Sequence, residues 1–346
     1  MADVLFRVDA STTIGVGHVM RCKALAEALA ERGMGAVFVA AHPAEVVHRL
    51  LQGTDFGVRV LPAGLGLGSM EEAQAVATLA RAAHAVVLDG YQFGPDYMAW
   101  LKQHGPLAIL DDMANLPRLP CDLLINSAPY APDLPYARLA PGADTALGPT
   151  FSLIRKEIRD QIGRGEVCPS RRTSVLVTFG GSDPLGLTLP VVRALLPALP
   201  QQVMVDVLLG PAVADVAKVM ADLQELGAGE RLRLHHAPPM VAPVMARAGL
   251  AITAGGGTVG ELVALGVPMV VAVVVDNQEG AANVEGDRPV IDMRCPGSLA
   301  ELVRVATDLW ADAPMRDNLA RAGQVAVDGL GALRVADKII RLSGRQ

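Results

Sequence analysis

The sequence predicts an α/β protein built from two doubly wound, Rossmann-like domains. Short Val- and Leu-rich segments alternate with Ala-rich segments of helical periodicity, which is the order that parallel βα units require. The same alternation begins again after a polar, charged stretch at residues 154–174, so a chain of 346 residues is expected to form two domains. We expect the domains to face each other across a cleft, with ligands bound beyond the carboxyl ends of the strands.

The first half contains segments with the composition of buried strands, separated by segments of helical periodicity. Strands are expected at 3–10, 35–41, 84–91, 107–114 and 121–128, and helices at 18–33 and 44–53. Gly33 suits the C-cap of the first helix. This half, residues 1–155, is the predicted first domain.

The second half repeats this pattern. Strands are expected at 174–183, 202–210 and 232–237 and a helix at 188–200, and residues 241–275 read as helix, strand, glycine turn, helix and strand. Residues 172–328 are the predicted second domain. The segment 329–346 is a predicted C-terminal helix that could pack back on the first domain.

Composition and charge argue against several classes of protein. The net charge is −6 with 3% aromatic residues and no run of Lys or Arg, so nucleic-acid binding is not expected. The longest apolar run, Val267–Val275, is too short to span a bilayer, and no signal peptide is recognised, so we expect a cytoplasmic protein. No metal-ligand spacing, cofactor or obligate protein partner is evident. The scattered cysteines are expected to be buried, reduced thiols: Cys22, Cys121, Cys168 and Cys295.

The loop after the first strand is a candidate catalytic loop. Gly15 and Gly17 allow a ligand to approach the backbone, and His18 stands where the next helix begins. An imidazole there suits general-base chemistry, whereas a helix-capping histidine is an equally open interpretation of the spacing alone. Asp9 ends the same strand and could orient His18, hold a sugar hydroxyl or cap the loop.

Two glycine turns in the second half are candidate nucleotide-binding loops. Gly180, Gly181 and Ser182 follow a strand, although a simple turn in which Ser182 and Asp183 cap the next helix would explain them. The three glycines at 255–257 precede Thr258, and their amides could bind a diphosphate. Glu261 could meet a ribose diol; a capping box between Thr258 and Glu261 is the alternative. Three consecutive glycines exceed what a cap requires.

Two further strand ends carry polar side chains. Asp276, Asn277 and Gln278 follow a very apolar strand and could contact nucleotide hydroxyls or an N-acetyl group, or simply form a polar loop. Asp89 and Tyr91 follow a first-half strand, and Tyr91 could bind substrate or pack on the surface. The remaining histidines show no shared pattern and are interpreted as structural.

Taken together, the motifs resemble one family. The segments FRVDASTTIGVGHVMRCKALAEAL, CDLLINSAPYA, ALGPTFSLIRKEI and VTFGGSDP, with the later glycine turn, glutamate and DNQ, resemble the UDP-sugar hydrolases of pseudaminic acid biosynthesis, the PseG family, in order over nearly the whole chain. The resemblance implies a GT-B-like fold with UDP held mainly by the second domain. It also implies metal-independent hydrolysis of UDP-2,4-diacetamido-2,4,6-trideoxy-β-L-altropyranose with inversion at the anomeric carbon.

The resemblance also implies roles for individual residues. His18 matches the general base, Asp9 and Tyr91 match residues of the cleft, Glu261 a contact to the UDP ribose, and Asn277 the amide of an Asn-Gln pair. The same alignment of motifs adds three substrate-side candidates: Arg21, Asn126 and Arg155. Three positions depart from the family pattern, namely Gly186 and Ala128, where asparagine is common, and Gly257, where serine is common. They bear on the substrate more than on the reaction.

Three other functions compete with hydrolysis. A GT-B glycosyltransferase with a UDP-sugar donor and an unknown acceptor ranks second; it would need an acceptor site, often apolar. A nucleotide-sugar binding module without activity ranks third, because the IGVGH segment is intact. A nicotinamide-dependent oxidoreductase ranks last, since Met20 interrupts the G-x-G-x-x-G fingerprint.

Overall fold

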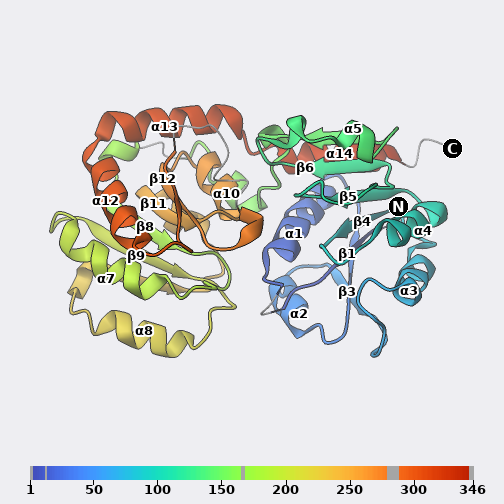
Figure 1. Ribbon diagram of the computed structural model, residues 1–346, viewed down its shortest axis with the longest axis horizontal. Helices are drawn as coiled ribbons and strands as arrows, with labels where there is room; N and C mark the ends of the chain where they lie inside the picture. Colours follow the sequence, from blue (N-terminus) through green and yellow to red (C-terminus); the bar gives the residue numbers. More distant parts are fainter. Residues whose placement is uncertain (1–2, 12–13, 165–167, 279–287, 343–346) are drawn as a thin grey trace. The chain divides into compact units, whose positions relative to one another are not determined.

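The computed structural model describes residues 3–11, 14–164, 168–278 and 288–342 (Figure 1). The chain divides into two compact domains. The first comprises Met1–Lys156 and Leu330–Gln346, and the second comprises Glu157–Gly329. Among the described residues, no helix combines the length and the apolar character needed to cross a membrane.

The first domain is a parallel sheet of seven strands in the order β3-β2-β1-β4-β5-β6-β7. The strands are β1 (Val4–Val8), β2 (Ala36–Ala40), β3 (Gly57–Val60), β4 (Ala85–Asp89), β5 (Leu107–Leu110), β6 (Leu123–Asn126) and β7 (Asp144–Leu147). The helices are α1 (Gly17–Ala30), α2 (Glu45–Leu51), α3 (Met70–Ala80), α4 (Pro95–His104), α5 (Tyr136–Leu139) and α14 (Gly331–Leu342). The short helix α6 (Lys156–Arg159) begins where the first domain ends.

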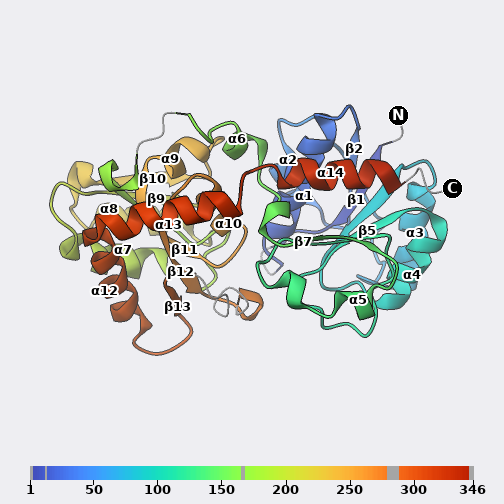
Figure 2. The same cartoon turned by 90° about the horizontal axis from the view of Figure 1, so that it is seen from above.

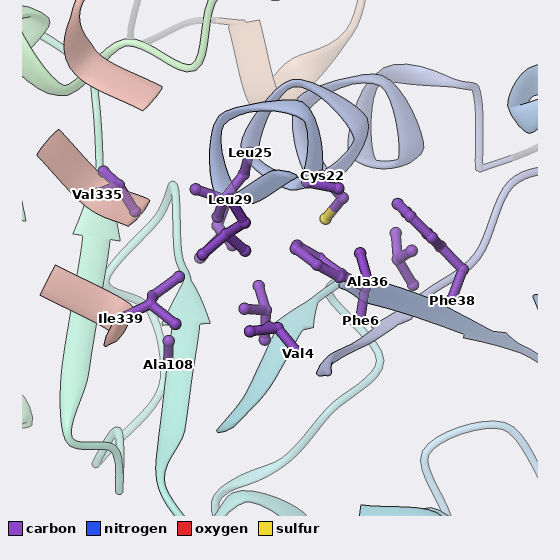
Figure 3. Packing of buried hydrophobic residues seen from close by; sticks show 14 of the residues in the cluster. Val4, Phe6, Cys22, Leu25, Leu29, Ala36, Phe38, Ala108, Val335 and Ile339 are labelled. Carbon is purple, nitrogen blue, oxygen red and sulfur yellow. The ribbon is translucent and has the colours of Figure 1, made fainter. Parts of the chain in front are cut away.

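Alternate residues of β1 face two separate cores. Val4, Phe6 and Val8 point to the face covered by α1, α2 and α14, whereas Leu5 packs with the residues of α3 and α4 on the opposite face. Figure 3 shows the first of these cores, with Leu25 and Leu29 of α1 beside Val335 and Ile339 of α14. Burial on both faces explains why these strands are continuous apolar runs rather than alternating ones.

The second domain is a parallel sheet of six strands in the order β10-β9-β8-β11-β12-β13. Figure 2 labels β9, β10, β11, β12 and β13, and Figure 1 labels β8. The strands are β8 (Ser174–Thr178), β9 (Met204–Leu209), β10 (Leu232–His236), β11 (Ala248–Ala254), β12 (Met269–Val273) and β13 (Val290–Asp292). The helices are α7 (Thr188–Ala198), α8 (Val216–Gln224), α9 (Ala242–Ala246), α10 (Thr258–Ala264), α12 (Ser298–Ala311) and α13 (Ala313–Ala326). Residues of α7, α8 and α12 form the core on one face of this sheet, and α13 packs against α10.

Every strand and helix expected from the sequence in the two halves is present, with ends that differ by a few residues. The expected strands at 84–91 and 107–114 end early, at Asp89 and Leu110, because the polar residues that follow leave the sheet as loops. The sequence prediction omits β3, α3, α4, α5 and β7 of the first domain and β13, α8, α12 and α13 of the second. Several of these elements form sheet edges or are amphipathic, where tertiary packing decides more than the local pattern does.

The cysteines correct one expectation. All four are free thiols, and Cys22 and Cys121 are buried as expected. Cys168 and Cys295 are exposed instead, because they lie in connecting segments rather than in the packed strands and helices.

Candidate functional site

In the first domain, the order in which successive strands are added to the sheet reverses beside β1. β1 pairs with β2 on one side and with β4 on the other, so the connections that leave β1 and β4 diverge at the carboxyl edge. This is the switch point at which open α/β sheets bind ligands. Val8 and Asp89 are paired at the ends of β1 and β4, and α1 starts at Gly17, which brings His18 to the same edge.

His18 is held by a buried carboxylate. Its Nδ1 lies 2.7 Å from Oδ1 of Asp89, and the two residues are 8% and 1% exposed. Arg21, one turn along α1, donates to both oxygens of Asp89 from Nε and Nη2, each at 2.6 Å. Burial acts to raise the pKa of Asp89, but Arg21 and His18 outweigh it and hold this pKa well below its ordinary value.

The ionised carboxylate of Asp89 determines which imidazole nitrogen is available. Asp89 can only accept hydrogen bonds, and its Oδ1 lies closer to Nδ1 of His18 (2.7 Å) than the donor Nη2 of Arg21 does (3.1 Å), so Nδ1 carries a proton and donates it to Asp89. The lone pair then resides on Nε2, which is the nitrogen that can accept a proton from a reactant.

Tyr91 and Asp112 complete the cluster around His18. The hydroxyl of Tyr91 donates to Oδ2 of Asp112 at 2.8 Å, and its ring stands edge-on to the imidazole with centroids 4.9 Å apart. The other oxygen of Asp112 accepts from Nη1 of Arg21 at 2.8 Å. Tyr91 is 50% exposed, so it presents a face of the cluster to solvent.

Asp9 is bound within the domain rather than to His18. Its carboxylate accepts from the backbone N–H of Ala41 at 2.8 Å and from Nε2 of Gln92 at 3.0 Å, and it pairs with Nη1 of Arg7 at 2.7 Å. Gly15 adopts φ +81° and donates to the carbonyl of Ser11, which closes the loop after β1. Space around Gly17, at the start of α1, is open.

A second buried charge cluster lies behind this loop. Arg7, on β1, is fully buried, and its Nε donates to Oε1 of Glu72 at 2.6 Å. Glu72 also accepts from the N–H of Gly68 at 2.6 Å and from the hydroxyl of Tyr97 at 3.0 Å. Arg7 therefore pairs with two carboxylates, Asp9 after β1 and Glu72 in the first turn of α3.

The other two substrate-side candidates are Asn126 and Arg155. Asn126 ends β6; its amide donates to the hydroxyl of Tyr136 at 2.8 Å and accepts from the N–H of Ala128 at 2.9 Å. That hydroxyl in turn donates to Oδ2 of Asp111 at 2.6 Å. Asn126 thus braces the loops after β5 and β6. Arg155 is half-buried and immediately precedes α6.

The second domain has the same kind of switch point, between β8 and β11. Gly180 adopts φ +75° in the turn after β8. A Cβ on Gly210 would lie 2.4 Å from the carbonyl oxygens of Gly180 and Gly181, so β9 passes directly against this turn. Asp183 caps α7, since its carboxylate accepts from the N–H groups of Leu187 and Thr188 at 2.8 and 2.9 Å. Ser182 precedes it in the turn and is half-buried.

The loops after β11 and β12 meet. Gly256 and Gly257 are exposed, and a Cβ on Gly256 would lie 4.0 Å from Nε2 of Gln278. Gln278 is fixed there because its Oε1 accepts from the N–H of Val274 at 3.1 Å. The structure therefore brings together two of the nucleotide-side motifs. The side chain of Asn277 lies outside the described part of the chain.

The start of α10 has a glycine at its N-cap. The helix begins at Thr258, and its N-cap residue, Gly257, has no side chain that could cap it. Glu261 is buried in the first turn. Backbone amides at the start of a helix are groups that can bind an anion.

Two carboxylates at the first site are missing from the set of candidate residues derived from the sequence. Asp89 is present in the sequence as a strand end, but its pairing with His18 depends on β4 being the neighbour of β1. Asp112 follows β5, which is the neighbour of β4. The signal for both is a carboxylate at or near the end of an apolar strand, and the order of the strands brings the two carboxylates to the same site.

Comparisons with known proteins identify the fold. No family model matches the chain, and no curated protein matches it. MurG of Acinetobacter baumannii superposes with a TM-score of 0.68 at 16% identity, covering 98% of this chain and 99% of that one. A putative UDP-N-acetylglucosamine 2-epimerase from Listeria monocytogenes gives 0.62 at 15% identity, covering 100% and 97%. MnaA of S. aureus, in a structure with UDP, gives 0.63 at 13% identity, covering 99% and 96%.

The chain thus has the GT-B fold, with two Rossmann-like domains. The predicted α/β fold class is confirmed by the two parallel sheets and by these structures. At identities of 13–16% the likeness defines the fold, and the reaction has to be argued from the site.

Proposed function

We propose that this protein is a nucleotide-sugar hydrolase of the PseG type. It releases UDP from UDP-2,4-diacetamido-2,4,6-trideoxy-β-L-altropyranose, a step in pseudaminic acid biosynthesis. The observation that carries the proposal is the His18–Asp89 pair at the switch point of the first domain, because it supplies a base for water. The sequence motifs and the GT-B fold, shared with a structure that contains UDP, support the choice of a UDP-sugar.

In the proposed reaction, Nε2 of His18 takes a proton from water while the water oxygen bonds to the anomeric carbon. The bond from that carbon to the diphosphate oxygen breaks, and its electron pair leaves with UDP. Attack opposite the leaving group inverts the anomeric carbon. Atoms and charge balance with water as the only co-substrate, so neither a metal nor a cofactor enters the scheme. The ionised Asp89 stabilises the imidazolium that forms.

The proposal assigns the UDP-binding residues to the second domain and the sugar-side residues to the first. The second domain binds UDP through the exposed amides at the start of α10 and the turn after β8, which stabilise the leaving diphosphate. Its proposed contacts are Gly180, Gly181, Ser182, Gly256, Gly257, Thr258, Glu261, Asn277 and Gln278. The proposed sugar-side residues of the first domain are Asp9, Gly15, Gly17, Arg21, Tyr91, Asn126 and Arg155.

Exposed apolar side chains favour a sugar that carries methyl groups. Large apolar residues are exposed on the connections that leave β1, β3, β4 and β5: Ile14, Leu67, Tyr91 and Met113. The loop of Leu67 packs on that of Tyr91, since a Cβ on Gly68 would lie 2.3 Å from the carbonyl of Gln92. One 6-deoxy and two acetamido methyl groups are proposed to contact exposed side chains of this kind. An apolar acceptor could also contact them, which makes a glycosyltransferase the second candidate.

The deciding experiment is UDP release from the proposed substrate by the purified protein, with EDTA and without an acceptor. We expect continuous release, with the inverted anomer as the first product in proton NMR. UDP-N-acetylglucosamine serves as the control donor and should react far more slowly. A protein that binds UDP but releases it only after an acceptor is added would refute hydrolysis and establish the transferase.

A substitution behind the turn after β8 should weaken UDP binding. We expect Gly210→Ala to destabilise the second domain by about 1–3 kcal/mol and to lower UDP affinity, because the new methyl group collides with the carbonyls of Gly180 and Gly181. Calorimetric titration with UDP measures the affinity. Gly105→Ala, in the first domain and in open space, is the control. Unchanged UDP affinity in Gly210→Ala would remove this turn from the nucleotide site.

A further inference from the structure

We propose that Asp112 is a positioning residue that keeps His18 basic by acting through Arg21. It neutralises the Arg21 guanidinium, so that the negative charge of Asp89 remains available to the imidazole. The inference deepens the proposed hydrolase mechanism and rests on it for the role in turnover. The property that it describes, the proton affinity of His18, can be measured without substrate.

The geometry places one cation between two carboxylates. The guanidinium of Arg21 binds Asp89 with Nε and Nη2 in a bidentate pair, each bond 2.6 Å long. Its remaining nitrogen, Nη1, lies 2.8 Å from Oδ1 of Asp112. Arg21 and Asp112 are about three-quarters buried and Asp89 is fully buried, so solvent screens these interactions weakly.

Counting charges shows why Asp112 is needed. With neutral His18, the ions Arg21, Asp89 and Asp112 together carry one net negative charge. The proton that His18 accepts from water brings the cluster to neutrality. Without Asp112, Arg21 and Asp89 would already cancel, and the new imidazolium would stand 3.1 Å from the Arg21 guanidinium with no net negative charge to balance it.

The thiol and hydroxyl groups around the cluster are neutral and leave this count unchanged, whereas Asp111 is a further acidic neighbour in both the parent and Asp112→Asn. From α1, the buried Cys22 thiol donates to Asp89 at 3.5 Å, and burial raises its pKa, so it stays protonated. After β4, Tyr91 donates its hydroxyl to Asp112. Beyond Asp112, the pKa of Tyr130 is raised, chiefly by burial, so it is neutral, and Asp111 accepts a hydrogen bond from Tyr136.

The pKa directions of the three ions agree with the geometry. Burial opposes ionisation of Asp112, but Arg21 outweighs it and lowers the pKa of this carboxyl. Burial also disfavours the charged form of Arg21, and Asp112 and Asp89 more than compensate, so its pKa is raised. All three side chains are therefore charged throughout the range in which a histidine titrates.

Removing one charge of each sign should move the titration of His18 in opposite directions. Asp112→Asn removes a negative charge while keeping an acceptor for Tyr91, so the titration midpoint of His18 should move to lower pH. Arg21→Gln removes the positive charge, so the midpoint should move to higher pH. The acidic limb of the pH–kcat/KM profile should follow each shift, because the base must be neutral to accept a proton. Misplacement of the ring alone would not produce opposite signs.

The experiment is NMR titration of the full-length protein with ring-labelled histidine. The His18 signal among the seven histidines is assigned by its loss in His18→Gln. Asp96→Asn and Arg118→Gln, an exposed ion pair in the same domain, are the matched charge controls and should leave the midpoint unchanged. If Arg21→Gln does not fold, the Asp112→Asn shift against Asp96→Asn decides alone.

The outcomes separate the inference from the proposed function. An unchanged or raised midpoint in Asp112→Asn, or shifts of the same sign in both variants, overturns the role of Asp112 even if the protein hydrolyses its substrate. Opposite shifts in a protein that does not hydrolyse UDP-sugars would support the electrostatic role and refute the hydrolase.

Discussion

Replacing His18 by alanine should lower the rate of UDP release by about 10²–10⁴-fold and leave UDP affinity unchanged. The substitution removes the base that accepts the proton of water, whereas UDP is proposed to bind the second domain. The local structure should survive, because Arg21 still pairs with Asp89 through two hydrogen bonds. Steady-state UDP release gives the rate, and calorimetric titration gives the affinity.

The control for this variant is a second histidine of the same domain. His104→Ala, at the exposed end of α4, should retain the wild-type rate, since its ring bonds only to the backbone carbonyl of Trp100 among the described residues. Wild-type turnover in His18→Ala would show that His18 is not the base. Loss of both UDP binding and turnover would show instead that the substitution disturbs the fold or the nucleotide site.

Arg7→Met should destabilise the first domain by about 3–5 kcal/mol. Arg7 is fully buried on β1 and pairs with two carboxylates, Asp9 and Glu72, which are 7% and 1% exposed. Without the guanidinium, both carboxylates remain in the interior with no cation beside them. The loss should exceed that of the exposed pair Arg118–Asp96, for which Arg118→Met is expected to cost at most about 1 kcal/mol.

This loss can be measured in one domain at a time. The chain has two tryptophans, Trp100 in α4 and Trp310 in α12, so fluorescence of a Trp310→Phe background reports unfolding of the first domain. Adding Glu72→Leu to Arg7→Met removes one of the two carboxylates that Arg7→Met leaves buried without a cation, and it should restore part of the stability. A free energy of unfolding within about 1 kcal/mol of the parent for Arg7→Met would show that the cluster contributes little.

The sequence was sufficient for the elements that are buried on both faces. The segment VLFRV reads as a strand although its fourth residue is arginine, because the four apolar neighbours outweigh one charge. The segment GVRV of β3 is similar in length to β1, but it lies largely exposed at the sheet edge, so its sequence has no clear apolar pattern. Such an exposed edge strand is one kind of element that the prediction omits.

The first site was only partly visible in the sequence for a related reason. His18 and its flanking glycines are contiguous, so the loop can be found by inspection. Asp89 and Asp112 are separated from His18 by 71 and 94 residues, and they reach it only because β1, β4 and β5 are adjacent. A linear pattern lists the carboxylates at strand ends, but strand order selects the two that meet the histidine.

The position of α14 in the first domain has a consequence for the order in which the protein is made. Ala332, Val335, Ala336 and Ile339 of this helix are fully buried in the core beside α1, yet they follow all of the second domain in the sequence. A growing chain therefore exposes the matching apolar face of the first sheet while residues 157–329 are synthesised. The second domain can complete its core before α14 has been made. The first domain leaves the ribosome earlier, but it completes its core later.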